Sequence, residues 1–187
     1  MALPDSTKPM LIVVTGRPGS GKTTLAHALA REIRCPAICR DEIKEGLVNT
    51  TGDAGSGADS IARHIYETFF ETIAMLLDRR VTLVAEAAFQ HKLWAPKLEP
   101  MLEKTRVRIV VCDIDPKLAR SRHVARGLAD PSRERFHGDP AVTAARQGVE
   151  LPIEPYDPPH LDVPTLRVDT SGEYAPSLAE IARFVRG

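Results

Sequence analysis

The sequence contains little cysteine, few aromatic residues and no excess of charge of one sign. Its 187 residues include three cysteines, and 5% of them are aromatic. Cys35, Cys39 and Cys112 are odd in number and form no CxxC pair. This argues against a disulfide framework or a zinc site, so we expect reduced and inert thiols. The 25 basic and 25 acidic residues balance, which argues against a protein that binds nucleic acid or membranes through a uniformly basic surface.

Long apolar runs are absent as well. The first ten residues, MALPDSTKPM, lack the apolar segment of a signal peptide, and the run over residues 11–14 is too short to span a membrane. We therefore expect a cytoplasmic protein that does not bind membranes. The chain length and the 43% share of apolar residues fit one globular domain, which we expect to cover residues 1–187.

Short apolar runs alternate with helical segments along the chain, which is typical of a parallel sheet flanked by helices. The predicted strands are residues 10–15, 37–39, 81–85, 107–112 and 165–168. The predicted helices are residues 23–33, 41–48, 59–79, 92–104, 116–126 and 177–186. Residues 49–57 are expected to form a flexible loop and residues 152–164 an irregular connection. This order predicts a three-layer α/β fold with a five-stranded parallel sheet.

One motif indicates phosphate chemistry. The segment GRPGSGKT, from Gly16 to Thr23, matches GxxxxGK[ST] and lies between a predicted strand and a predicted helix. The glycines let backbone N–H groups approach phosphate oxygens, and the N-terminus of the next helix faces the same anion. Lys22 can reach the β- and γ-phosphates, and the Thr23 hydroxyl can coordinate Mg²⁺. The expected nucleotide-binding residues are Gly16, Arg17, Pro18, Gly19, Ser20, Gly21, Lys22, Thr23 and Thr24.

A nucleoside triphosphate site serves several classes of protein. A GTP-dependent switch usually carries an N/TKxD motif, and this sequence has none. Mechanical ATPases have a strong hhhhDE motif, whereas the apolar run that ends at Asp113 lacks the second carboxylate. The remaining class is the small kinases, which transfer a phosphoryl group to a hydroxyl. The sequence therefore predicts a P-loop kinase fold.

The chain resembles the small P-loop kinases of the zeta-toxin, chloramphenicol phosphotransferase and polynucleotide kinase grouping, which are AAA-type ATP-binding kinases. Five segments carry the resemblance in the same order along the chain. They are GRPGSGKTT at 16–24, CRDEI at 39–43, VAEAAF at 84–89, RHVARG at 122–127 and VDTS at 168–171. The resemblance implies ATP and Mg²⁺ as cofactors and covers most of the chain.

The resemblance also implies roles for acidic residues that follow the second and third strands. Asp41 matches the aspartate that takes the proton from the acceptor hydroxyl. Glu86 occupies the position of an acid that is usually aspartate in the family, so we assign it to substrate binding or, with Thr23, to the metal. In an open α/β sheet such residues meet beyond the carboxyl ends of the strands. Two other interpretations stay open: Asp41 as a helix N-cap, and Asp113 as a structural acid.

A basic stretch follows the fourth predicted strand. Five arginines and two acids within residues 120–135 give it a net charge of +3. Arg122 and Arg126 are four residues apart on one predicted helix and match the RxxxR of the family's lid. We expect an arginine-rich lid over about residues 120–140 that stabilises transition-state charge, with Gly127 and Gly138 as hinges. The competing interpretation is a solvated basic helix face.

The proposed activity is transfer of the γ-phosphoryl group of ATP, with Mg²⁺, to a hydroxyl of a small molecule. Arg40, Asp41, Glu86 and Phe89 are the expected acceptor-binding residues, and Thr170 and Ser171 lie where related kinases hold adenine. The alternative interpretation is that Phe89 is part of the hydrophobic core. Two other functions stay open: a polynucleotide 5'-hydroxyl kinase, since Arg40 and Asp41 match that family's RD pair, and a nucleotide-binding regulator with low ATPase activity. The sequence leaves open the acceptor, the choice between Asp41 and Glu86 as the base, the choice between ATP and another triphosphate as donor, and the oligomeric state.

Overall fold

A computed structural model describes residues 8–52, 58–130 and 132–187 of the protein. Within these residues five strands form one sheet in the order β2-β3-β1-β4-β5, and every neighbouring pair is parallel. The strands are β1 (Met10–Thr15), β2 (Ala37–Cys39), β3 (Leu83–Ala87), β4 (Arg106–Asp113) and β5 (Thr165–Asp169). The predicted α/β fold with a five-stranded parallel sheet is confirmed.

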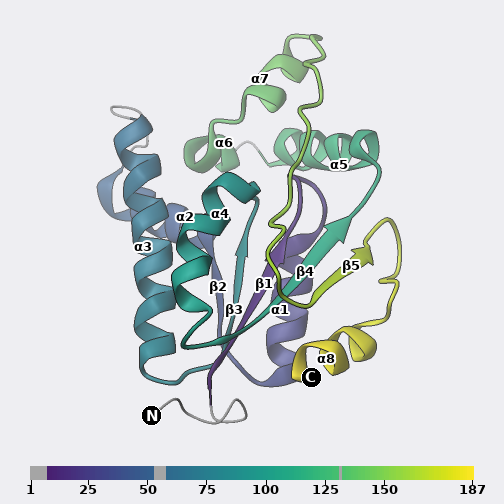
Figure 1. Cartoon of the computed structure of the whole chain (residues 1–187). Helices are drawn as coiled ribbons and strands as arrows, with labels where there is room; N and C mark the ends of the chain where they lie inside the picture. The colour runs from purple at the N-terminus through teal and green to yellow at the C-terminus, as the bar shows by residue number, and fades with distance from the viewer. Residues whose placement is uncertain (1–7, 53–57, 131) are drawn as a thin grey trace.

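Helices cover both faces of the sheet (Figure 1). They are α1 (Lys22–Ile33), α2 (Arg40–Thr51), α3 (Ala58–Asp78), α4 (His91–Leu98), α5 (Pro116–Ala129), α6 (Ser132–His137), α7 (Pro140–Arg146) and α8 (Leu178–Arg186), with a short 3₁₀ turn, η2 (Glu99–Met101). Helices α5, α6 and α7 lie above the carboxyl ends of the strands (Figure 1). No helix among the described residues is both long and apolar enough to cross a membrane.

The central strand β1 is buried along its whole length and contributes to both halves of the core. Because successive side chains of a strand point to opposite faces, Ile12 and Val14 pack with α1 and α8, while Leu11 and Val13 pack with α3 and α4. The sheet is therefore enclosed by two helical layers. Side chains that do not belong to the core can lie close together at the carboxyl ends of the strands.

Strand β3 differs from the prediction. It begins at Leu83 and continues through Glu86 and Ala87, whereas the sequence predicted residues 81–85. The register pairs Glu86 with Val14 of β1, so Glu86 is part of the buried strand and does not follow it. A charged residue inside an apolar run looks like a strand end in the sequence, although its partner in space can keep it there.

The segments around the sheet also differ in places. Helix α2 continues to Thr51, so part of the expected loop over 49–57 is helical, and residues 53–57 lie outside the described residues. The helix expected over 92–104 is α4 followed by η2, with prolines at 96 and 100. Residues 147–164, all of them described, contain no helix or strand, as expected for the irregular connection over 152–164.

Candidate active site

The P-loop connects β1 to α1 through two glycines in the left-handed region. Gly19 has a φ of +81° and Gly21 a φ of +79°. A Cβ on Gly19 would lie 2.0 Å from the carbonyl oxygen of Ala119 in α5, so only glycine fits there. The N-cap position of α1 is Gly21, which has no side chain to cap the helix. The first backbone N–H groups of α1 are therefore available to an anion, as the motif predicts.

Glu86 lies beside the first turn of α1. Its Oε1 is 3.7 Å from Lys22 Nζ, and its Oε2 accepts a hydrogen bond of 3.2 Å from the Thr23 hydroxyl. Glu86 is 2% exposed. Burial raises the pKa of this carboxyl above its ordinary value, although the charge of Lys22 opposes the shift. The structure thus brings together the two oxygen-bearing residues that the sequence assigned to a metal, and hydroxyl and carboxylate oxygens are the ligands that Mg²⁺ prefers.

Asp41 lies in the first turn of α2, across from Lys22. Its Oδ1 accepts a hydrogen bond of 2.8 Å from Arg40 Nη1. Burial raises the pKa of Asp41, but the hydrogen bond and charge of Arg40, together with Lys22 and His137, outweigh it and hold the pKa below the ordinary value. The carboxylate is therefore ionised at neutral pH. The interpretation of Asp41 as N-cap is wrong, because Cys39 occupies that position and no side chain caps the helix.

The two arginines of α5 that the sequence assigns to a lid have different partners. Arg126 lies next to Lys22 and Asp41, and burial lowers its pKa, with further lowering by Arg133. Arg122 instead donates hydrogen bonds to the backbone oxygens of Thr170 and Ser171. Arg122 therefore contacts the turn after β5 in this structure, and its role toward the phosphates stays a prediction. Residues four apart on a helix share a face only approximately, since 3.6 residues complete a turn, and two long side chains can follow different partners.

The turn after β5 is where the sequence placed adenine. The backbone N–H of Thr170 donates to the Asp113 carbonyl oxygen at 3.0 Å, and its hydroxyl donates to the same oxygen at 3.2 Å. The N–H of Ser171 donates to Asp169 Oδ1 at 2.7 Å. The bonds of Thr170 fix the turn to the end of β4, and those of Arg122 fix it to α5. The role of this turn in binding a base stays a prediction.

Phe89 does not line the site. Its ring packs against Tyr66, Phe70 and Trp94, with centroid distances of 5.4, 6.0 and 5.6 Å. The expectation that Phe89 binds the acceptor is wrong, and the alternative core role holds. In an extended segment neighbouring side chains point to opposite sides, and here Ala88 lines two cavities that the ring of Phe89 does not.

Among the described residues, two of the hollows at the carboxyl edge of the sheet are lined by Lys22. The P-loop pocket is bounded by Gly19, Gly21, Lys22, Thr23 and Thr24 on one side and by residues of α2, α5 and α6 on the other. The inner cavity lies between the P-loop, α2 and α5–α7. Its basic lining residues are Lys22, Arg40, Lys44, Arg126, Arg133 and Arg146, its acidic ones are Asp41 and Asp139, and His123 and His137 complete its polar wall.

Helices α6 and α7, which the sequence did not predict, close the inner cavity. His137 Nε2 lies 2.9 Å from Glu45 Oε1, and Lys44 Nζ donates to the His137 carbonyl oxygen at 3.4 Å. His123 of α5 pairs with Asp139 at 2.7 Å. The signal for α7 was present in the sequence, because Asp139 followed by proline is the same N-cap signature that α5 has at its start.

Comparisons with known proteins agree with this fold. Residues 11–151 match the AAA domain family model. A search of curated proteins found no match. Among solved structures, a candidate kinase from Chloroflexus aurantiacus J-10-fl is 25% identical with a TM-score of 0.75, and the similarity covers 96% of this chain and 97% of that one.

Two enzymes with assigned substrates share the fold at lower identity. The APS kinase CysC of Mycobacterium tuberculosis, solved with AMPPNP and APS, is 18% identical, with a TM-score of 0.64 over 97% of this chain and 99% of that one. A gluconokinase from Sinorhizobium meliloti 1021 is 17% identical, with a TM-score of 0.51 over 96% and 89%. With its P-loop, its sheet order and these matches, the chain belongs to the AAA domain family and has the fold of the small P-loop kinases.

Proposed function

We propose that the protein transfers the γ-phosphoryl group of ATP, with Mg²⁺, to a hydroxyl group of a small molecule that carries an anionic group. The observation that supports this most directly is the meeting of Lys22, Asp41 and Arg126 at the wall shared by the P-loop pocket and the inner cavity. A cation for the phosphates, a carboxylate for the acceptor and a guanidinium for the transferred group are what phosphoryl transfer requires.

On the donor side, the N-terminus of α1 and Lys22 hold the phosphates. Thr23 and Glu86 are the residues that would hold Mg²⁺, because their oxygens already adjoin one another. When bound, the ion neutralises charge on the phosphates. Arg126 and Arg133 line the P-loop pocket from the other side, and guanidinium groups in that position stabilise the charge that develops on the transferred phosphoryl group.

On the acceptor side, Asp41 orients the hydroxyl and accepts its proton. Its lowered pKa keeps it ionised, and Arg40 fixes its orientation through the 2.8 Å hydrogen bond. A carboxylate of ordinary or low basicity suffices, because little proton transfer is needed before the phosphoryl group leaves ATP in a loose transition state.

The charge of the inner cavity supports an anionic acceptor. Lys22, Arg126 and Arg133 also line the P-loop pocket, so we assign them to the nucleotide. The inner cavity then still contains the ammonium group of Lys44 and the guanidinium of Arg40, which is hydrogen bonded to Asp41. Its second acid, Asp139, is paired with His123 and caps α7. A phosphate, sulfate or carboxylate on the acceptor would match these cations.

A screen of paired acceptors tests the proposal. Sugars and nucleosides, each with and without a phosphate or carboxylate group, are incubated with MgATP, and ADP release and product mass are measured. We expect phosphorylation of an anionic member of a pair at a rate well above its neutral counterpart. Asp41→Asn should remove the acceptor-stimulated rate, whereas the exposed control Glu103→Gln should keep it.

The same assay separates the other two functions. Labelling of an oligonucleotide 5' end with a steep loss of affinity on addition of salt would identify a polynucleotide kinase. Nucleotide binding without acceptor-stimulated turnover across the whole panel would identify a regulator. Either result would overturn the small-molecule assignment.

A further inference from the structure

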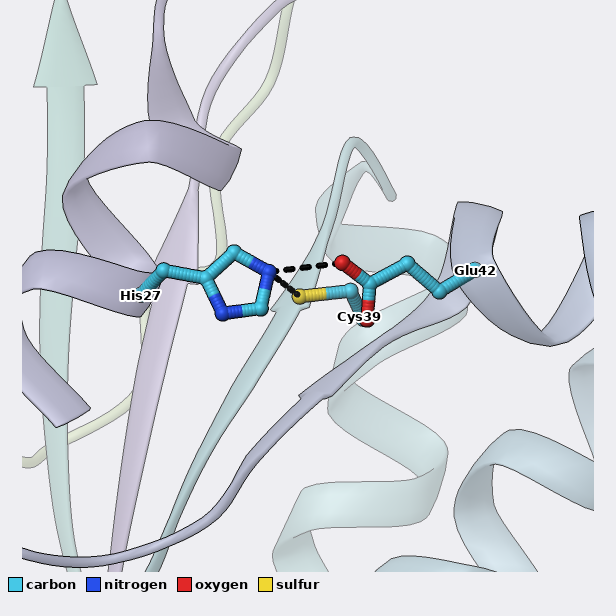
Figure 2. Close-up of side chains that lie close together, drawn as sticks. All are labelled: His27, Cys39 and Glu42. Carbon is cyan, nitrogen blue, oxygen red and sulfur yellow. Dashed lines mark hydrogen bonds and ion pairs between the residues drawn. The ribbon is translucent and has the colours of Figure 1, made fainter. Parts of the chain in front are cut away.

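A second group of potential metal-ligating side chains lies close to Asp41 and Glu86. It consists of His27 from α1, Cys39 at the end of β2 and Glu42 in the first turn of α2, and Figure 2 shows their side chains converging on one point. His27 Nε2 lies 2.6 Å from Glu42 Oε1 and 3.6 Å from Cys39 Sγ. The three donor atoms all lie within 4.8 Å of one another.

Nitrogen, thiolate sulfur and carboxylate oxygen are the donor set of Zn²⁺. In a tetrahedral Zn²⁺ site with bonds of about 2.0–2.3 Å, neighbouring ligand atoms are about 3.4–3.6 Å apart. The nitrogen–sulfur distance already has this value. The nitrogen–oxygen distance would have to open by about 0.8 Å, which the half-exposed side chain of Glu42 allows.

The arrangement also provides access and a fourth position. The side chains of His27 and Glu42 are 43% and 50% exposed, whereas Cys39 is 2% exposed. The sulfur therefore forms the floor of the site, and the side toward solvent is open to the incoming ion and to a water ligand. Three protein ligands with an open fourth position is a coordination that Zn²⁺ commonly adopts.

An ion pair between His27 and Glu42 does not account for the third residue. A buried thiol that points at an imidazole nitrogen gains little from a neutral contact, yet Cys39 is surrounded by acids. Burial raises the pKa of its thiol, and the charges of Glu86, Glu42 and Asp41 raise it further. The same negative surroundings that oppose a bare thiolate favour a divalent cation, and a coordinated thiol loses its proton.

We propose that His27, Cys39 and Glu42 form a binding site for Zn²⁺ that is separate from the proposed Mg²⁺ site and adjoins it. Cys39 connects the two, because it is the partner of Glu86 in the pairing of β2 with β3. Binding of Zn²⁺ replaces the thiol proton by the metal and releases that proton to solvent. The sequence did not reveal the site, since its ligands have none of the usual zinc spacings.

The experiment uses untagged full-length protein, freed of metal by a chelator and titrated with Zn²⁺ in excess Mg²⁺ and ADP, which occupy the nucleotide site. Calorimetry should give one equivalent of Zn²⁺, with about one proton released in buffers of different ionisation enthalpy. Titration with Co²⁺ should produce a thiolate-to-metal absorption band in the near ultraviolet.

Variants assign the ligands. His27→Ala and Glu42→Gln change exposed side chains and should weaken Zn²⁺ binding by about tenfold or more. Cys39→Ser should abolish the Co²⁺ band, whereas the matched control Cys35→Ser should keep both the band and the affinity. Absence of the band in the wild type, or unchanged Zn²⁺ affinity in both His27→Ala and Glu42→Gln, would overturn the proposal.

Discussion

Lys22 and Glu86 form a buried ion pair beneath the P-loop, with 3.7 Å between Nζ and Oε1. Their side chains are 10% and 3% exposed. Removing one partner of such a pair leaves an uncompensated buried charge, which is costly. Burial also outweighs Lys22 in its effect on the pKa of Glu86. We therefore expect both groups to gain from stronger partners, phosphate oxygens for Lys22 and a cation for Glu86.

The first prediction concerns nucleotide binding. Lys22→Ala should abolish the stabilisation by MgATP, which for wild-type protein is about 2.7 kcal/mol at a hundredfold excess over Kd. Because the substitution also leaves Glu86 unpaired, the measured quantity is the shift in Tm on addition of MgATP to each variant, not the Tm of the free protein. Lys104→Ala, a change of an exposed lysine far from the P-loop, is the control. An equal MgATP shift in wild type and Lys22→Ala would refute the assignment.

The second prediction separates the two arginines of α5. Arg126→Ala should lower kcat by roughly 10³ to 10⁵, as removal of an arginine finger does, with a much smaller change in ATP affinity. Arg126→Lys should restore little activity, since an ammonium lacks the planar fork of the guanidinium. Arg122→Ala should have the opposite profile, because Arg122 holds the turn at Thr170. Steady-state kinetics and ATP titrations of the three variants measure kcat and ATP affinity. The same changes in both quantities for Arg126→Ala and Arg122→Ala would contradict the prediction.

The third prediction compares two glycines of the P-loop. Both have positive φ, which costs a residue with a side chain about 1–2 kcal/mol. At Gly21 nothing lies within 4 Å of an added Cβ, whereas at Gly19 it would meet the Ala119 carbonyl oxygen at 2.0 Å. Gly19→Ala should therefore destabilise the free protein by clearly more than Gly21→Ala does. Chemical denaturation of the two variants measures the difference, and equal losses would show that α5 moves aside freely.

The fourth prediction concerns acid stability. The hydrogen bond from His123 lowers the pKa of Asp139 to about 2, and its charge and the backbone N–H groups of α7 add to the shift while burial opposes it. A carboxyl whose pKa is lower in the folded state stabilises the fold above its unfolded pKa, and this contribution is lost as the pH falls toward the folded value. Asp139→Ala should cost about 1–2 kcal/mol at pH 7, after allowance for solvent screening.

The pH series distinguishes this effect from general damage to α7. The stability difference between wild type and Asp139→Ala should shrink as the pH falls from about 4 toward 2. Thermal unfolding at several pH values measures it. A difference that persists unchanged at pH 3 would assign the loss to packing instead of charge.

Local patterns in the sequence predicted much of this fold. The β-branched run before Gly16 gives β1, and the acid followed by Pro116 starts α5 where expected. The sequence predicts that β3 starts at Val81, two residues too early, because Val81 and Thr82 are as compatible with a strand as the residues that follow. Only the pairing of Leu83 with Leu11 of β1 sets its true register.

The sequence did not predict the direction in which individual side chains point. Phe89 and Ala88 are adjacent in the chain, and which of them faces the cavity depends on the aromatic cluster around Trp94. The partners of Arg122 come from residues about fifty positions away. Helix α6 is only six residues long, so it depends for stability on tertiary contacts such as that of His137 with Glu45. Such features depend on long-range contacts, which no short motif encodes.

The arrangement of the P-loop pocket and the inner cavity has a consequence for the kinetics. They share the side chains of Lys22, Asp41, Arg126 and Arg133, and the other residues that line them differ. With the nucleotide in the P-loop pocket and the acceptor in the inner cavity, neither ligand blocks the binding site of the other. We therefore expect a random sequential mechanism, in which double-reciprocal plots intersect and a dead-end analogue of either substrate competes only with the substrate that it mimics.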